Sequence, residues 1–227
     1  MRVSLLASAL MVTALALAAP ASADSPAEIQ AFVKKAEATV ETFAADDLVA
    51  DQFRDLAPQA KGVMILPTNV KGGFILGGSG GNAAMLARDP ATGQWSYPAF
   101  YILGSITFGL QIGGEVSEII MLVMTQKGVD AVLGGSFKLG ADVSVAAGPV
   151  GAGGKAQTAD ILAWARSKGA YAGLNVEGAV IEPKDNWNAI YYDKTGVRPL
   201  DILVNGSATN AQADSLRAAV RSFAAAK

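Results

Sequence analysis

The chain has 227 residues, of which 51% are hydrophobic, and its 18 basic and 20 acidic side chains give a formal net charge of −2 at pH 7. It contains no histidine and no cysteine. This composition excludes a Ser-His-Asp triad, a thiol nucleophile, disulfide bonds and a zinc site built on His or Cys. A mildly acidic chain is also a poor candidate for nonspecific nucleic-acid binding, so no nucleic-acid partner is expected.

Residues 1–23 have the composition of a cleaved, Sec-type secretory signal peptide. Arg2 supplies the positive charge, Leu5 to Ala19 form an apolar run, and the Ala-Ser-Ala that ends at Ala23 matches the small-x-small cleavage pattern. The alternative is an uncleaved anchor helix, because the apolar run is nearly long enough to span a bilayer. No cysteine follows, so the segment is not a lipoprotein signal. We therefore expect a periplasmic or secreted protein whose mature chain, residues 24–227, forms a single domain.

The first predicted elements are two helices within residues 24–57. Ser25 with Glu28 forms a capping box at the start of the first helix. Apolar residues then recur at helical spacing from Ile29 to Phe43, which predicts one apolar face. A shorter helix is predicted from Ala50 to Leu56. Such a face usually docks on the core of its own domain, and the alternative is a helix that lies on a membrane.

Glycine divides the chain, because all 25 glycines lie at or beyond Gly62. Glycine is costly inside helices, so residues 60–205 are predicted to form strands and turns, with short helices. From Phe100 to Gly113 the even positions are apolar apart from one glycine, and the odd positions are mixed. This period of two is typical of a strand whose even face lies against the core. A strand of this length must bend or break, at Gly104 and Gly109.

Further strands are predicted where the alternation recurs, from Phe137 to Ala147, and where a continuous apolar run, Glu118 to Met124, indicates burial on both faces. Between them, Thr125 to Gly135 is predicted to form a short helix. The tail, residues 208–226, has a stripe of apolar side chains at helical spacing and is predicted to form an amphipathic helix. The fold class is therefore α+β: a strongly curved, barrel-like antiparallel sheet, rich in glycine, with amphipathic helices at the N- and C-termini.

Two glycine-rich segments fail as cofactor sites. Gly148 to Thr158 resembles a phosphate loop, but Pro149 stands where a Walker A motif needs glycine, and Ala156 stands where it needs Ser or Thr. Gly77 to Ala83 matches a dinucleotide fingerprint but does not open a helix. No cofactor is therefore expected.

Four carboxylates in apolar or small-residue surroundings leave an enzyme open as an alternative: Glu115, Glu118, Asp142 and Glu177. Buried carboxylates are costly unless they are paired, and a pair with raised pKa values could act as acid and base. The more usual outcome is pairing with Arg or Lys. The spacing of these residues matches no metal-binding loop, so no metal is expected.

The chain contains six sequence blocks in this order: "AKGVMILP", "KGGFILGGSGGNAAMLAR", "WSYPAFYILGSITFGLQIGGE", "LGADVSVAAGPVG", "YAGLNVEGAVI" and "DNWNAIYY". In this order the blocks resemble the SYLF domain, also called the Ysc84 or DUF500 domain, and the resemblance runs from about Ala60 to Leu203. The motif positions that we expect to be structural are Trp95, Ser96, Pro98, Gly109, Gln111, Gly113, Gly148, Pro149, Gly151, Gly173, Glu177 and Gly178.

The resemblance implies a non-enzymatic module. Members of the family bind lipids, and eukaryotic members bind phosphoinositides partly through an N-terminal amphipathic helix. The resemblance therefore implies the fold and a tendency to bind lipid. Together with the predicted signal peptide, it leads us to expect a protein of the cell envelope that binds phospholipid or another amphiphile, with possible peripheral contact to a membrane. The residues expected to contact lipid first are Ile29, Phe32, Val33, Lys34 and Lys35. Two alternatives stay open: a small carboxylate-based envelope enzyme, and a small outer-membrane β-barrel, in which the apolar faces of the strands would point outward.

Overall fold

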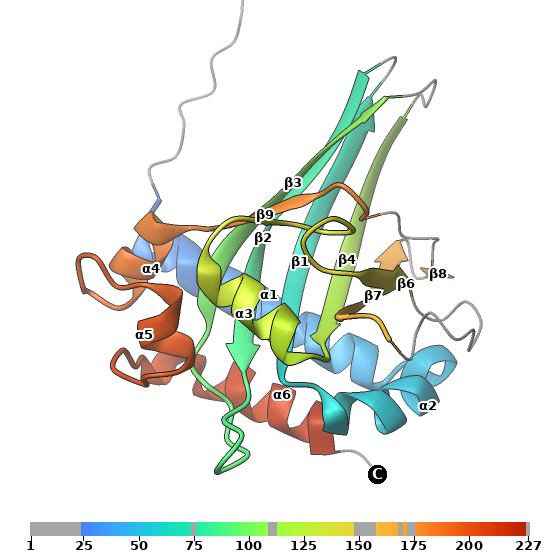
Figure 1. The fold of residues 1–227 in the computed structure, drawn as a ribbon. Coiled ribbons are helices and arrows are strands. Elements are labelled where there is room, and N and C mark those ends of the chain that lie inside the picture. The colour runs from blue at the N-terminus through green and yellow to red at the C-terminus, as the bar shows by residue number, and fades with distance from the viewer. Residues whose placement is uncertain are drawn as a thin grey trace, which may run out of the picture.

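The computed structural model describes residues 24–73, 76–108, 113–147, 158–167, 170–171 and 176–225. In this structure, helices lie on both faces of a twisted, curled sheet (Figure 1). The predicted signal peptide, residues 1–23, lies outside the described residues. So does most of the segment that resembles a phosphate loop.

One sheet joins all the described strands. Their bounds are β1 (Gly62–Gly73), β2 (Leu76–Ala87), β3 (Ala99–Phe108), β4 (Gly113–Val123), β5 (Phe137–Lys138), β6 (Val145–Ala147), β7 (Ile161–Ser167), β8 (Ala170–Tyr171) and β9 (Val180–Pro183). The order across the sheet is β5-β9-β3-β2-β1-β4-β7-β6, with β8 beside β7. Every neighbouring pair of these strands is antiparallel except β6 and β7. The predicted α+β class with a strongly curved, mainly antiparallel sheet is confirmed.

Helices precede, interrupt and follow the strands. Their bounds are α1 (Pro26–Ala44), α2 (Asp47–Leu56), α3 (Gln126–Gly134), α4 (Asp185–Tyr191), α5 (Pro199–Leu203) and α6 (Asp214–Ala225), with short 3-10 turns η1 (Ala57–Gln59) and η2 (Ala211–Ala213). The Ser25 side chain accepts a hydrogen bond from the Glu28 backbone N–H at 3.2 Å, so the predicted start of α1 is confirmed. Among the described residues, no helix combines the length and the apolar character that a membrane span requires.

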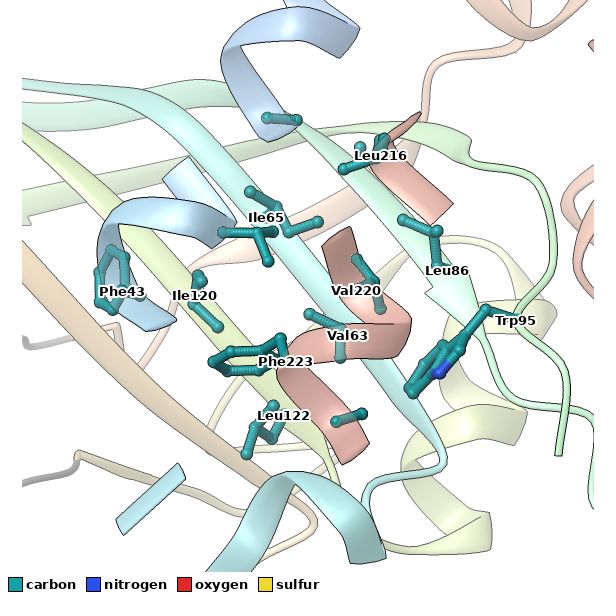
Figure 2. Packing of buried hydrophobic residues seen from close by; sticks show 14 of the residues in the cluster. Phe43, Val63, Ile65, Leu86, Trp95, Ile120, Leu122, Leu216, Val220 and Phe223 are labelled. Carbon is teal, nitrogen blue, oxygen red and sulfur yellow. The ribbon is translucent and has the colours of Figure 1, made fainter. Parts of the chain in front are cut away.

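The sheet has a core on each face. On one face, which we call the α1 face, α1 and α6 cover the strands, and Ile120 and Leu122 of β4 lie in one cluster with Phe43 and Phe223 (Figure 2). On the other face, Ile119 belongs to a second cluster that includes residues of α3 and α5. Because neighbours along a strand point to opposite faces, the apolar run of β4 is buried on both sides, as predicted.

The first and last described helices, α1 and α6, contact each other across the α1 face. Gln30 Nε2 donates a hydrogen bond to the backbone oxygen of Gln212 at 3.1 Å. Ser215 Oγ donates to Glu37 Oε2 at 2.7 Å. Segments from opposite ends of the described chain therefore build one layer.

The four long strands β1 to β4 continue beyond the helices (Figure 1). We call this part the sheet extension; it comprises residues 69–73, 76–82, 102–108 and 113–117. Its strands remain paired in register to their described ends. The sheet extension is therefore a regular, fully paired part of the sheet.

The prediction that the even side chains of β3 all face the core is wrong at Ile102. Phe100 is buried, but Ile102 is 45% exposed, whereas Tyr101 and Leu103 of the odd face are buried. The reason is that the helices that cover this face of the sheet do not extend along the whole strand. Phe100 packs against side chains of α1 and α4, and the sheet extension begins two residues later.

Of the predicted bend or break at Gly104, the break does not occur, because β3 stays in register with β2 on both sides of this residue. A Cβ atom at Gly104 would meet nothing within 4 Å, so no other part of the described structure covers the sheet at this glycine. The other predicted position, Gly109, lies outside the described residues.

The prediction of one strand from Phe137 to Ala147 is wrong. The structure has two short strands, β5 and β6, separated by a turn in which Asp142 Oδ2 accepts a hydrogen bond from the Lys138 backbone N–H at 2.7 Å. Gly140 adopts a φ of 82° in this turn, which glycine tolerates without strain. The alternation in the sequence arises because side chains of the turn, such as Leu139, are buried without forming a continuous ladder.

Candidate functional site

The structure places the five predicted lipid contacts in different environments. Ile29 and Val33 are fully buried beneath α1, so they are core residues here and contact with lipid would require α1 to leave the domain. Lys34 and Lys35 are exposed. Phe32 is half-buried, and its ring meets those of two other aromatic residues edge to face. Of the five, only Phe32, Lys34 and Lys35 are therefore accessible in this conformation.

A groove of about 280 Å³ lies beside α1 on the α1 face. We call it the helix groove; it is lined by Glu28, Ala31, Phe32, Lys35, Thr68, Asn82 and Trp187. These residues come from α1, β1, β2 and α4. The groove thus joins two of the accessible predicted residues, Phe32 and Lys35, to segments that sequence reasoning did not connect with them.

A hydrogen-bonded cluster adjoins the helix groove and shares Trp187 and Asn82 with its lining. Trp187 Nε1 donates to Asp24 Oδ1 at 2.6 Å, and Lys184 Nζ lies 3.6 Å from both that oxygen and the centre of the Trp187 ring. Lys184 also donates to Asn82 Oδ1 at 3.2 Å. The hydrogen bond from Trp187, opposed by some burial and aided by Lys184, lowers the pKa of Asp24 below its ordinary value. Lys184 is therefore already neutralised by a carboxylate.

Three large apolar side chains lie exposed on the same face, beyond the helix groove. We call Val70, Ile102 and Val116 the sheet patch; they are 53%, 45% and 57% exposed. Val70 stands opposite Val116 in β4, and Ile102 stands opposite Asn82 of the helix groove. The patch and the groove therefore form one continuous surface.

The opposite face of the sheet extension is polar. Ser79 and Ser105 share a hydrogen bond of 2.7 Å, Lys71 stands opposite Glu115, and Asn69 donates to the hydroxyl of a serine on β4 at 3.4 Å. The sheet extension thus has one face that is mainly polar apart from the buried Leu103, and one face that is mainly valine, isoleucine and glycine apart from Asn82. Polar side chains can form hydrogen bonds with water. The exposed apolar side chains of the other face have no other element packed over them within the described residues.

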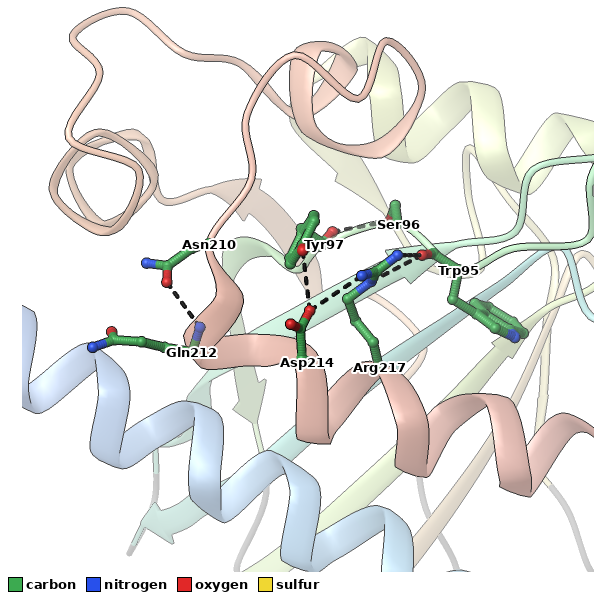
Figure 3. Close-up of polar contacts among 7 residues, drawn as sticks. All are labelled: Trp95, Ser96, Tyr97, Asn210, Gln212, Asp214 and Arg217. Carbon is green, nitrogen blue, oxygen red and sulfur yellow. Dashed lines mark hydrogen bonds and ion pairs between the residues drawn. The ribbon is translucent and has the colours of Figure 1, made fainter.

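A second, larger groove of about 550 Å³ lies against α6; we call it the α6 groove. The Arg217 guanidinium donates two hydrogen bonds to the carbonyl of Trp95, at 3.1 and 2.8 Å, and pairs with Asp214 at 3.2 Å (Figure 3). The Tyr97 hydroxyl donates to Asp214, and burial together with this bond raises the pKa of Tyr97. Arg221 also lines the groove and is exposed.

The described motif residues that carry the resemblance have structural contacts. Trp95 is buried, and Ser96 Oγ accepts a hydrogen bond from the Ala87 N–H at 3.0 Å. The Pro98 carbonyl accepts a hydrogen bond from Tyr192 at 2.6 Å. Gly113 pairs with β1, and Glu177 and Gly178 form a turn in which Gly178 has a φ of 82°. The remaining positions lie outside the described residues: Gly109, Gln111, Gly148, Pro149, Gly151 and Gly173.

The structure does not gather the candidate carboxylates at one place. Glu115 and Glu118 point to opposite faces of β4, and Glu118 accepts a hydrogen bond from Arg166 Nη1 at 3.2 Å. Asp142 and Glu177 lie in turns before β6 and β9. Within the described ranges, no three His, Cys, Asp or Glu side chains are grouped so that they could hold a metal ion.

Sequence reasoning missed one carboxylate that the structure places at a junction. Asp160 accepts hydrogen bonds from the Thr125 hydroxyl at 2.6 Å and from the Ser144 backbone N–H and hydroxyl at 2.9 and 2.8 Å. Burial opposes its ionisation, but these bonds and the nearby Lys127 lower the pKa of Asp160 to about 2. A lone acidic residue directly before an apolar strand was the signal that could have identified it.

Comparison with known proteins gives consistent matches. The family model "Ysc84: Las17-binding protein actin regulator" matches residues 104–223. The SH3 domain-containing YSC84-like protein 1 of Homo sapiens is 31% identical over 171 residues, which are 73% of this chain and 49% of that protein. The LAS seventeen-binding protein 3 of Saccharomyces cerevisiae is 31% identical over 179 residues, which are 74% of this chain and 39% of that protein. The chain therefore spans half or less of the length of these relatives.

The fold defines an α+β domain with a curled sheet, helices on both faces and two surface grooves. With the family model covering more than half of it, the chain belongs to the Ysc84 family, whose module is the SYLF domain. The family model is described as a binding protein and regulator, and the yeast relative is named as a binding protein; neither of these names is that of an enzyme.

Proposed function

We propose that this SYLF domain is a non-enzymatic module that binds phospholipid at the surface of a membrane in the cell envelope. The single observation that carries the proposal is the sheet patch, the exposed cross-strand pair Val70 and Val116 together with the exposed Ile102 on the same face of the sheet extension. An ordered apolar face of this kind is expected to meet an apolar partner, and lipid is the partner that the family resemblance implies.

The size of the sheet patch favours reversible binding. Burying apolar surface contributes about 25 cal/mol per Å², so each half-exposed side chain adds roughly 1 kcal/mol when it enters the boundary of the lipid tails. Three such side chains are too few for permanent insertion. Lys34 and Lys35, exposed on the neighbouring helix, add attraction to phosphate groups that salt weakens.

The envelope location rests on residues 1–23, which have the composition of a secretory signal. Its test is the mass of the protein recovered from fractionated cells that express the full chain. A mass that begins at Asp24, found outside the cytoplasm, supports the location, and an intact N-terminus in the cytoplasm contradicts it.

The binding proposal is tested by sedimentation of the purified protein with phospholipid vesicles. The double variant Val70→Thr, Val116→Thr keeps the branched shape of both side chains while adding a hydroxyl to each. It is expected to bind about tenfold more weakly, and the deficit should persist at high salt, because apolar burial is lost.

The matched control for this experiment is Val204→Thr, since Val204 is 57% exposed like Val116 but follows α5, away from the sheet patch. It should bind vesicles like the unsubstituted protein. The proposal fails if the protein stays in the supernatant with every vesicle, or if the double variant and the control bind equally well.

A second candidate function is binding of a protein, and the α6 groove favours it. The lining of the groove contains two cations, Arg217 and Arg221, and one carboxylate, Asp214. Its net charge is therefore positive, which suits an acidic segment of a partner. The family model is described by Las17 binding, so purified Las17 is the first partner to test. Arg221→Glu should weaken binding in the groove and leave vesicle binding unchanged; equal Las17 binding by both proteins would remove this candidate.

A further inference from the structure

We infer that the helix groove takes the head group of a zwitterionic phospholipid, with the phosphate at Lys35 and the ammonium at Glu28. This inference rests on the proposed function, and it adds the class of lipid and the place of its head group. It follows from the charges, the hydrogen-bonding groups and the position of the groove.

The helix groove presents one cation and one anion that are not engaged with each other. Glu28 and Lys35 both line it from α1, and they lie about 10 Å apart along the helix axis, since a helix rises 1.5 Å per residue. Both are exposed, and no ion pair joins either of them to another side chain in the part of the chain that the structure describes. Both side chains are long enough to bend toward one ligand between them.

The other cation near the helix groove does not change this balance. Lys184 is paired with Asp24 and lies over the ring of Trp187, so its charge is already offset. The groove lining is therefore neutral overall but strongly dipolar. A purely anionic head group would be repelled by Glu28, and a nonionic head group would form no ion pair with either Glu28 or Lys35.

The polar wall of the groove offers donors to a phosphate. Asn82 Oδ1 accepts the hydrogen bond from Lys184, which leaves the amide nitrogen of Asn82 as a donor toward the groove. Thr68 adds a hydroxyl on the same side. The aromatic rings of Phe32 and Trp187 form the apolar part of the lining, against which methylene groups can pack.

The position and volume of the groove fit a head group and not a whole lipid. Its volume of about 280 Å³ lies just below the usual range for drug-sized ligands, roughly 300–1,000 Å³. Ile102 of the sheet patch stands opposite Asn82, so acyl chains that leave the groove pass directly onto the patch. One lipid would thus use both parts of the continuous surface.

The test compares vesicles of phosphatidylcholine with vesicles of phosphatidylglycerol, using the purified protein and two groove variants, Glu28→Gln and Lys35→Gln. The matched controls are Glu41→Gln and Lys61→Gln, which change exposed charges outside the groove. Each groove variant should bind phosphatidylcholine roughly three- to tenfold more weakly, and each control should bind it within twofold. Glu28→Gln should also raise binding to phosphatidylglycerol.

A second arm separates the head group from the bilayer by titrating free phosphocholine and inorganic phosphate, followed by the fluorescence of the tryptophans. Phosphocholine should perturb the signal with the unsubstituted protein and not with Lys35→Gln, whereas inorganic phosphate should act more weakly. If both vesicle types bind equally and only the Val70→Thr, Val116→Thr variant loses binding, the head-group inference is overturned and the proposed function stands. If no vesicle binds, both are overturned.

Discussion

The side-chain amide of Asn188 in α4 makes two hydrogen bonds with the backbone of Phe100 in β3. The Phe100 N–H donates to Asn188 Oδ1 at 2.8 Å, and Asn188 Nδ2 donates to the Phe100 carbonyl at 3.2 Å. Asn188 is fully buried. The last residue of β9 pairs with Tyr101, so the amide continues the hydrogen-bond ladder of β3 where its neighbouring strand ends.

Substitution Asn188→Asp should destabilise the domain by about 3 kcal/mol at pH 7. The carboxylate cannot donate to the Phe100 carbonyl, and it places a charge in the core. Urea unfolding measures the loss. Gln94→Glu, an amide-to-acid change at an exposed position, is the control and should change stability by less than about 0.5 kcal/mol. Equal stability of both variants would contradict the role given to Asn188.

Two glycines of neighbouring strands should respond oppositely to alanine. A Cβ at Gly81 would lie 2.2 Å from the Thr68 carbonyl oxygen, whereas one at Gly104 would meet nothing within 4 Å. Gly81→Ala should therefore cost about 2 kcal/mol or more through displaced backbone. Gly104→Ala should be neutral or should stabilise by up to about 1 kcal/mol, because it restricts the unfolded chain. Thermal unfolding of both variants checks this. A similar shift of the midpoint temperature in both would contradict the close contact between Gly81 and the Thr68 carbonyl.

Asp160 should give the domain an acid-labile component of stability. Its pKa is lowered from 3.8 to about 2 on folding, so the ionised form stabilises the folded state. The contribution, about 2 kcal/mol, is complete above the unfolded pKa and is lost as pH falls from about 4.5 toward 2. Comparing urea unfolding of the unsubstituted protein and Asp160→Asn across this range measures it. The difference should shrink as pH falls, and a difference independent of pH would disprove the linkage.

Arg166 should couple β7 to β4 and to the end of α1. Its guanidinium contacts Glu118 at 3.2 Å and Asp46 at 3.8 Å, and Thr39 of α1 donates to Glu118 at 3.1 Å. Because the paired side chains are about one-third exposed, Arg166→Met should cost only about 1–2 kcal/mol. A double-mutant cycle with Glu118→Gln should give a coupling of about 1 kcal/mol that decreases in salt.

Lys61→Met, at an exposed position, is the control for the Arg166 series. Additive effects of Arg166→Met and Glu118→Gln would show that the two side chains do not act together.

Sequence patterns predicted those parts of the fold that depend on interactions between residues close together in the sequence. Ser25 marked the start of α1 because capping depends on neighbours in sequence, and the apolar run before Met124 marked a strand buried on both faces. The exposure of Ile102 could not be predicted, because it depends on where a helix from elsewhere in the chain stops covering the sheet. Alternation alone misled at Leu139, since single side chains of a compact turn, here Leu139 and Val143, can also be buried.

The candidate site was only partly predictable for the same reason. Phe32 and Lys35 stood out because they share a predicted helix with clear amphipathic spacing. Asn82 and Trp187 complete the helix groove, but they reach it through strand pairing and the docking of α4. No spacing along the sequence links them to α1.

The contact between α1 and α6 has a consequence for the synthesis of the protein. As the ribosome makes the chain, α1 emerges before any strand of the sheet, and α6 emerges after all of them. The apolar side of α1, with Ile29 and Phe43, must therefore wait for nearly the whole chain before its cover is complete. Nascent chains halted before Asp214 would carry this uncovered helix, which makes them natural clients for chaperones.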